Sequence, residues 1–287
     1  MTTVEETVFE LSNKSVFFVG GLPRSGTTWV QKLIESHPSA KCLGESHFFN
    51  DLFPNAYSAL VEYSKRREQG VATWAPTVKG FDLEYVRHVL RVSFFTLVAK
   101  NLDTKLPSEI AAIGEKTPEN VTNLDKIKFL FPDARLIHVI RDPRDGAVSG
   151  YARFRSKLDK GMTQAEYAKA YGKGWVERIT KVRHESKRQN YYEIQYENLI
   201  KNSNDEVRKL FVFLGLPATP QIVEASVAEC SFEKLSGGRN RGDADPQSHF
   251  RSGMVGSWKE TLTSDDATGI ERIGQELMRE LGYLPNA

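Results

Sequence analysis

The chain carries a glycine-rich loop whose residue types suit a phosphate-binding site. Its segment Gly21–Thr28 fits the Walker pattern G-x-x-x-x-G-K-[ST], except that Thr27 stands in place of the lysine. Backbone N–H groups of such a loop converge on anionic oxygens, and Gly26 permits their close approach. Arg24 offers several fixed donors to a short anion, and threonine hydroxyls add to them without a metal ion. The loop therefore predicts a site for a phosphate that needs neither the Walker lysine nor magnesium.

A second candidate anion site follows the apolar run RLIHVI. Arg141 comes directly after this run, and Ser149 follows eight residues later, about two helical turns into the next element. Both side chains can therefore donate to one phosphate. An ion pair of Arg141 with Asp142 or Asp145 is the alternative interpretation. More arginines gather near Arg153 and again at 239–251, and this local charge predicts a small polyanion as the ligand.

The bulk composition restricts the class of protein. With 287 residues, 40% hydrophobic and 26% charged, the chain is typical of a soluble globular protein, and no segment has the roughly 20 apolar residues of a membrane span. A net charge of +2 argues against a globally basic nucleic-acid binder. Two cysteines are too few for a zinc cluster or a disulfide framework. The acidic start MTTVEETVFELSNK lacks the order of a secretory signal, so we expect a cytoplasmic protein.

Short apolar runs alternate with helical patterns along the chain. We expect strands at 16–20, 111–114, 135–140 and 191–196, and helices at 28–36, 82–101, 124–131, 143–154, 163–189 and 205–214. This alternation predicts one α/β domain over residues 1–287, with a central parallel sheet flanked by helices. Residues 1–14 form an N-terminal extension in this scheme. Residues 239–257 are glycine-rich with little periodicity, which predicts a mobile loop.

The motif PRSGTTW after a strand resembles the 5′-phosphosulfate loop of sulfotransferases that use 3′-phosphoadenosine 5′-phosphosulfate (PAPS). The resemblance implies a fold like that of P-loop nucleoside triphosphate hydrolases. It implies that Arg24 contacts the bridging oxygen and the sulfuryl group. It also assigns donor binding to the rest of the loop, namely Ser25, Gly26, Thr27, Thr28 and Trp29.

The remaining donor contacts are implied by three further motifs. Arg141 and Ser149 match the family's 3′-phosphate motif, and Tyr196 in YYEIQYENLIKN matches the tyrosine that touches the adenine. The stretch FRSGMVGSWKE resembles the loop that closes over the 3′-phosphate and assigns Arg251, Ser252 and Gly253 to it. Ser252 stands where the family has lysine and Ser257 where it has aspartate, so one cationic contact is missing. The product is 3′-phosphoadenosine 5′-phosphate (PAP), and no metal is expected.

The catalytic base is expected at Glu45. Cytosolic members of the family place a histidine within Lys-Thr-His, whereas GEKTPEN has Pro118 at that position, and proline cannot accept a proton. Glu45 in KCLGESHFFN resembles the glutamate of tyrosylprotein and heparan-type N-sulfotransferases. A desolvated carboxylate can take the proton of the acceptor. His47 is the rival base, and on a strand the two side chains would share a face.

Lys116 of the same GEKTPEN motif is the third expected catalytic residue. Its ammonium can stabilise the leaving phosphate or the sulfuryl oxygens, as the lysine does in those two branches. A salt bridge to Glu115 or Glu119 is the alternative interpretation.

We therefore expect a sulfotransferase that moves a sulfuryl group to a hydroxyl or amine of a small-molecule or carrier-bound acceptor, without nucleic-acid or membrane partners. The two basic sites are expected on opposite flanks of the sheet. The acceptor pocket is expected near Phe48, Phe49, the segment 57–80 and the helix around Trp175. A nucleotide kinase or P-loop NTPase, and a non-catalytic nucleotide-binding module, are the alternatives. The sequence indicates neither the acceptor nor the oligomeric state.

Overall fold

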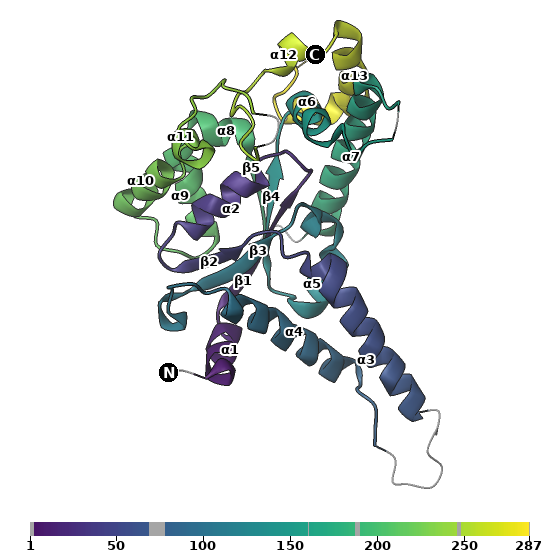
Figure 1. Ribbon diagram of the computed structural model, residues 1–287, viewed down its shortest axis with the longest axis vertical. Helices are drawn as coiled ribbons and strands as arrows, with labels where there is room; N and C mark the ends of the chain where they lie inside the picture. The colour runs from purple at the N-terminus through teal and green to yellow at the C-terminus, as the bar shows by residue number, and fades with distance from the viewer. Residues whose placement is uncertain (1–2, 69–77, 160, 187–189, 246–247, 287) are drawn as a thin grey trace.

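Five parallel strands form a single sheet in the order β2-β3-β1-β4-β5 (Figure 1). The computed structural model describes residues 3–68, 78–159, 161–186, 190–245 and 248–286. The strands are β1 (Ser15–Gly21), β2 (Ala40–Leu43), β3 (Ala112–Lys116), β4 (Arg135–Ile140) and β5 (Tyr191–Gln195). Because β1 lies between β3 and β4, its carboxyl end adjoins those of both neighbours. The predicted α/β class and parallel sheet are confirmed.

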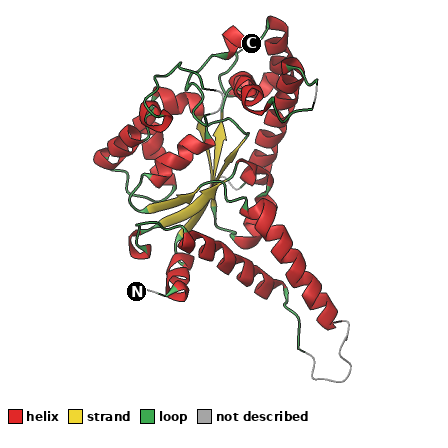
Figure 2. Cartoon of the chain, viewed as in Figure 1, coloured by secondary structure: helices red, strands yellow, loops and turns green. Residues whose placement is uncertain are grey.

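Helices cover both faces of the sheet (Figure 2). One face packs against α1 (Val4–Ser12), α3 (Phe53–Glu68), α4 (Leu83–Lys100) and α5 (Leu124–Leu130). The other packs against α2 (Thr27–Glu35), α8 (Tyr196–Lys201), α9 (Ser203–Phe213) and α10 (Pro220–Glu229). A third apolar cluster joins α6 (Pro143–Phe154), α7 (Gln164–Glu185) and α13 (Ser264–Glu280) beside the end of β4. The short helices α11 (Phe232–Ser236) and α12 (Trp258–Thr261) complete the C-terminal part.

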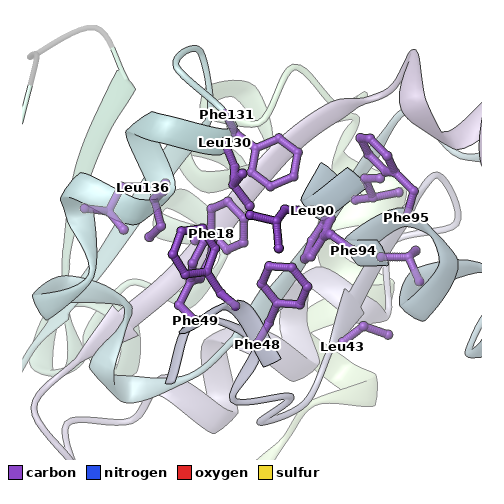
Figure 3. Close-up of a cluster of buried hydrophobic side chains, with 14 of the residues drawn as sticks. Phe18, Leu43, Phe48, Phe49, Leu90, Phe94, Phe95, Leu130, Phe131 and Leu136 are labelled. Atoms are coloured by element: carbon purple, nitrogen blue, oxygen red, sulfur yellow. The ribbon is translucent and has the colours of Figure 1, made fainter. Parts of the chain in front are cut away.

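Strand β1 owes its position to side chains that are apolar on both faces. Phe17, Phe18 and Val19 are fully buried, as expected for a central parallel strand. Phe18 enters a cluster of aromatic rings, 5.2 Å from the ring of Phe49 and 5.6 Å from that of Phe94 (Figure 3). Each such ring contributes about 2–3 kcal/mol by leaving water. This packing fixes the strand whose end carries the phosphate loop.

Figure 3 also corrects one expectation from the sequence. Phe48 and Phe49 are 0% and 1% exposed and lie in the core, so they do not shape an acceptor pocket. A pair of adjacent phenylalanines after a strand serves packing here because a short helical turn, Phe48–Leu52, directs both rings inward.

Several elements escaped the sequence analysis. Strand β2 was missed because it is short and contains Lys41, whose buried ammonium pairs with Glu35 and Asp103. Residues 4–12, expected as part of an extension, form α1, whose Leu11 is buried against α4. Helices α10 and α13 were also not predicted. Among the described residues, no helix combines the length and the apolar character needed to cross a membrane.

Candidate active site

A cavity of about 340 Å³ opens at the carboxyl ends of β1 and β4. Its walls come from the phosphate loop, from α6 and α8, and from the segment 249–253. Most of the residues singled out from the sequence line it: Arg24, Gly26, Thr27, Thr28, Trp29, Glu45, Arg141, Ser149, Tyr196, Arg251, Ser252 and Gly253. Ser25 and Lys116 do not line the cavity and are 2% and 3% exposed.

The phosphate loop has an unusual backbone. Arg24 and Gly26 both adopt left-handed conformations, with φ of 74° and 102°. A Cβ atom at position 26 would lie 2.6 Å from Cδ2 of Tyr196, so only glycine allows the tyrosine ring to approach the loop. Helix α2 begins immediately afterwards at Thr27, and its N-terminus therefore adjoins the cavity. Strain of this kind collects at binding sites.

Arg24 reaches across the cavity toward α6. Its Nε donates to Oγ of Ser149 at 3.2 Å, and its Nη2 donates to the carbonyl oxygen of His249 at 3.0 Å. Burial, and next the charge of Arg141, lower the pKa of Arg24 to about 10. The guanidinium is still charged at neutral pH, and an anion beside it would relieve the repulsion.

Arg141 stacks on the purine-contact candidate. Its guanidinium lies 4.3 Å from the ring centroid of Tyr196, and its Nη1 donates to the carbonyl oxygen of Arg24 at 3.2 Å. The sequence predicted the two basic sites on opposite flanks of the sheet, and this prediction is wrong. Both sites lie at the carboxyl ends of the adjacent strands β1 and β4, and hydrogen bonds join them. A single bound molecule can therefore contact both.

The acidic neighbours of Arg141 have other partners. Asp142 pairs with Arg144 at 2.7 Å. Asp145 is fully buried and accepts the backbone N–H groups of Gly256 and Trp258 at 2.6 and 3.0 Å. Arg144 also binds Glu271 and the carbonyl oxygen of Tyr283, both near the end of the chain. The acidic residues thus hold the C-terminal segment against α6 and leave Arg141 for the cavity.

Several buried polar atoms beside the cavity lack a partner among the described residues. They are Oγ of Ser25, Nε of Arg141 and Nε of Arg251. An unpaired buried donor costs about 1–3 kcal/mol, and three of them around one cavity suit a ligand with several anionic oxygens. Burial and the charge of Arg141 lower the pKa of Arg251, which again favours a bound anion. These observations fit a nucleotide that carries two phosphates.

Aromatic rings form the other end of the cavity. The indole of Trp29 donates to the carbonyl oxygen of Cys230 at 2.9 Å and meets Tyr196 edge-on at 5.6 Å. Phe232 and Arg241 complete this end of the cavity. The guanidinium of Arg241 lies 5.5 Å from the ring centroid of Trp29 and 5.4 Å from the ring centroid of Phe232. The sequence analysis did not single out Phe232, because a lone phenylalanine after a serine carries no distinguishing pattern.

Glu45 and Lys116 form an ion pair at the cavity wall. Oε1 of Glu45 lies 2.5 Å from Nζ of Lys116, because β2 and β3 pair with Leu43 opposite Glu115 and so bring the loop after β2 to the end of β3. Burial opposes ionisation of Glu45, but the hydrogen bond and charge of Lys116 outweigh it and lower the pKa of the carboxyl group. The alternative pairing with Glu115 is not formed, because that carboxylate accepts from Ser46, Thr117 and Asn120.

His47 lies on the other side of the Glu45 carboxylate. Its Nε2 is 3.8 Å from Oε2 of Glu45. The two residues were expected to share the face of a strand, but neither lies in one, and His47 has a left-handed backbone with φ of 49°. Glu45 thus has a cationic partner in Lys116 and the His47 imidazole nearby, while 38% of its side chain stays exposed.

The expected acceptor region is mostly elsewhere. Of the segment 57–80, residues 69–77 lie outside the described part, and the rest contributes nothing to the cavity lining. Helix α3 starts in the core at Phe53, and its far end extends away from the sheet (Figure 1). Trp175 is buried and donates to the carbonyl oxygen of Arg141 at 3.0 Å, while Tyr171, one turn earlier, donates to that of Pro23 at 2.8 Å. Helix α7 therefore supports both basic sites from behind.

Comparison with known proteins agrees with this geometry. The family model described as the sulfotransferase family matches residues 17–220. The chain belongs to the sulfotransferase family. A relative from Cavia porcellus, 3-beta-hydroxysteroid sulfotransferase, is 30% identical over 174 residues, which cover 55% of this chain and 60% of the relative. The matched part thus spans less than two thirds of that relative's length.

Two other comparisons cover nearly the whole chain. Protein-tyrosine sulfotransferase A from Caenorhabditis elegans is 20% identical over 270 residues, 94% of this chain and 67% of that protein. The crystal structure of mouse sulfotransferase SULT7A1 complexed with PAP superposes with a TM-score of 0.60 at 19% identity, covering 97% and 91% of the two chains. At this identity the likeness shows the sulfotransferase fold.

Proposed function

We propose that this sulfotransferase-family chain moves a sulfuryl group from PAPS to a hydroxyl or amine of an acceptor. The observation that carries the proposal is that one cavity is lined by the phosphate loop, by Arg141 and Arg251 and by Glu45, whose carboxylate pairs with Lys116. The PAP ligand named for the mouse relative supports the choice of donor. Bound PAPS supplies an activated sulfuryl group, and the chain supplies its orientation and a base.

The cavity lining suggests how the donor is held. Arg24 and the loop from Ser25 to Thr28 bind the 5′-phosphosulfate end, where the helix α2 dipole also favours an anion. Arg141, Ser149 and Arg251 bind the 3′-phosphate with donors that are otherwise unpaired or weakly paired. The Arg24–Ser149 hydrogen bond is exchanged for bonds to the donor. Trp29 and Tyr196 contact the adenine.

Arg241 and residues 249–253 form the outer wall over the donor, and they belong to the segment made of 239–245 and 248–257. Arg239, Arg241 and Arg251 donate hydrogen bonds within this segment, and the Asp145 carboxylate accepts the backbone N–H of Gly256 near its end. Release of the segment from Arg24, which bonds the carbonyl of His249, opens the cavity for exchange of donor and product.

Glu45 acts as the base. It takes the proton of the acceptor while the acceptor oxygen or nitrogen bonds to sulfur, and the bond between sulfur and the bridging oxygen breaks with its electron pair on the departing phosphate. Lys116 neutralises Glu45 in the free protein. When Lys116 turns to the negative charge that develops on the donor, it leaves Glu45 a stronger base at the moment a proton must be accepted.

Calorimetry tests the donor assignment. PAP binds with micromolar or lower dissociation constant in this proposal, and binding does not depend on magnesium. Tight ATP binding that requires magnesium, with no affinity for PAP, points to a kinase or NTPase instead and overturns the proposal.

Transfer of radiolabelled sulfuryl from PAPS tests the chemistry. The acceptors are 4-nitrophenol, a 3β-hydroxysteroid and a tyrosine-containing peptide. We expect Glu45→Gln to lower kcat by about 10²–10⁴-fold with PAP affinity unchanged within a few fold. A wild-type protein that binds PAP and sulfates none of the panel supports a non-catalytic binding module.

A further inference from the structure

His249 is a cavity-lining residue that the assigned roles leave unused. It lies on the segment that covers the cavity, and it shares the lining with Glu45, Arg24 and Pro118. Only its backbone is engaged: the carbonyl oxygen accepts Nη2 of Arg24 at 3.0 Å. Neither ring nitrogen has a hydrogen-bond partner among the residues that the structure describes.

The position of His249 relates it to the reacting groups. Because Arg24 holds its backbone, the imidazole is tied to the arginine that binds the 5′-phosphosulfate end in the proposed function. The charges of Arg24, Lys116, Glu45 and Arg153 all act on the ring, and they come from the phosphate loop, from β3, from the residues after β2 and from α6. Because His249 lines the same cavity as Glu45 and Arg24, it lies where acceptor and donor meet in the proposed function.

The ring stays uncharged at neutral pH. Burial lowers the pKa of His249 below its ordinary value, the cations Arg24 and Lys116 lower it further, and Glu45 opposes them. A neutral imidazole has one N–H donor and one nitrogen acceptor. It can therefore hold a hydroxyl or amine by a hydrogen bond in either direction.

We infer that His249 binds the acceptor, donating or accepting a hydrogen bond at its nucleophilic hydroxyl or amine, and so aligns that group between Glu45 and the sulfuryl group. The inference rests on the proposed function. It assigns the acceptor end of the cavity to the wall made by Glu45, Pro118 and His249. Since Arg24 bonds the backbone of His249, the arginine that binds the donor in the proposed function also fixes the position of the imidazole.

Kinetics of His249→Ala and His249→Gln test this role, with the acceptor from the panel that the wild type sulfates fastest. Loss of one hydrogen bond predicts a rise of about tenfold in KM for the acceptor in the alanine variant, with partial recovery in the glutamine variant. The dissociation constant for PAP stays within twofold of the wild type, which also shows that the variants fold. His88→Ala, an exposed histidine on α4 away from the cavity, is the control and changes neither constant.

The pH profile separates binding from a merely structural role. Protonation of His249 removes the acceptor nitrogen and adds charge beside three cations. Because the pKa of His249 is lowered, the wild-type kcat/KM declines only at a pH below the ordinary histidine value, and the glutamine variant lacks this part of the decline. An unchanged KM for the acceptor, or a loss of PAP affinity equal to the loss of activity, overturns the inference. A wild type that sulfates no acceptor overturns the proposed function itself, and the inference with it.

Discussion

The hydroxyl of Tyr171 offers a clean perturbation of the phosphate loop. This side chain is buried, and its OH donates to the carbonyl oxygen of Pro23 at 2.8 Å, directly before the left-handed Arg24. Tyr171→Phe removes one oxygen and leaves that carbonyl unpaired. A lost hydrogen bond with a buried unpaired acceptor costs about 1–3 kcal/mol, so we expect the free energy of unfolding to fall by about 1.5 kcal/mol.

The same change reaches ligand binding. A left-handed non-glycine residue costs about 1–3 kcal/mol and persists because its surroundings hold it. Without the Tyr171 bond, Arg24 adopts the binding conformation in a smaller fraction of molecules, and a loss of about 1.4 kcal/mol weakens PAP binding about tenfold. Urea denaturation gives the first quantity and calorimetry with PAP the second.

Tyr167→Phe is the matched control for this experiment. Tyr167 lies one turn earlier on α7, packs on Gly150, and its hydroxyl has no hydrogen-bond partner among the described residues. We expect its loss to change stability and PAP affinity by less than about 0.5 kcal/mol. A Tyr171→Phe protein with wild-type stability and wild-type PAP affinity refutes the reasoning, and so does an equal loss in both variants.

Two further predictions concern buried ionisable groups. Burial lowers the pKa of His138 to about 4, so the unfolded chain binds this proton before the folded protein does as pH falls from about 6.5 toward 4. The free energy of unfolding therefore declines by about 3 kcal/mol over that window. We expect urea titrations at several pH values to show a smaller decline in His138→Gln. An equal decline in the variant contradicts the assignment to His138. Asp145→Asn replaces a carboxylate that accepts two backbone N–H groups and the Ser257 hydroxyl, and we expect about 3 kcal/mol lower stability and at least tenfold weaker PAP binding by calorimetry. A stability loss with unchanged PAP affinity means that the C-terminal segment does not serve the donor.

The strands and helices around the anion sites could be predicted because their signals are local. The apolar run RLIHVI between helical patterns predicts a buried strand. Arg141 at its end is therefore expected at the carboxyl ends of the strands, where ligands bind in parallel sheets. Ser149 was predicted from its helical spacing after Arg141 and from the resemblance to the family's 3′-phosphate motif, and it lies beside Arg24 in the cavity. For these residues, local pattern and tertiary position agree.

Other features depend on long-range pairing, which a single sequence does not reveal. Lys41 gives β2 a polar sequence, and only the folded structure shows that Glu35 and Asp103 neutralise its buried ammonium. Phe48 and Phe49 were predicted to shape the acceptor pocket, but they pack in the aromatic cluster around Phe18, which only the tertiary structure reveals. The meeting of Glu45 with Lys116 needs the β2–β3 register, so the sequence proposed both residues without pairing them.

The sequence contains a pattern that predicts helix α13, although the helix was not predicted. Thr263 caps it by accepting the N–H of Asp266, and Ile270 and Met278 repeat at helical spacing on its buried face. What the pattern does not show is the target of that face, which is α7 and α6 behind the cavity.

The contacts of Arg144 join α13 and Tyr283 to α6, a helix that lines the cavity. Its guanidinium joins Asp142, at the start of α6, to Glu271 and to the carbonyl oxygen of Tyr283. None of the described residues after 262 lines this cavity, yet their removal would take two partners from the buried Arg144 guanidinium and release α6, which carries Ser149. We therefore expect a shortened protein that ends before α13 to keep every residue that lines the cavity and still to lose their fixed arrangement.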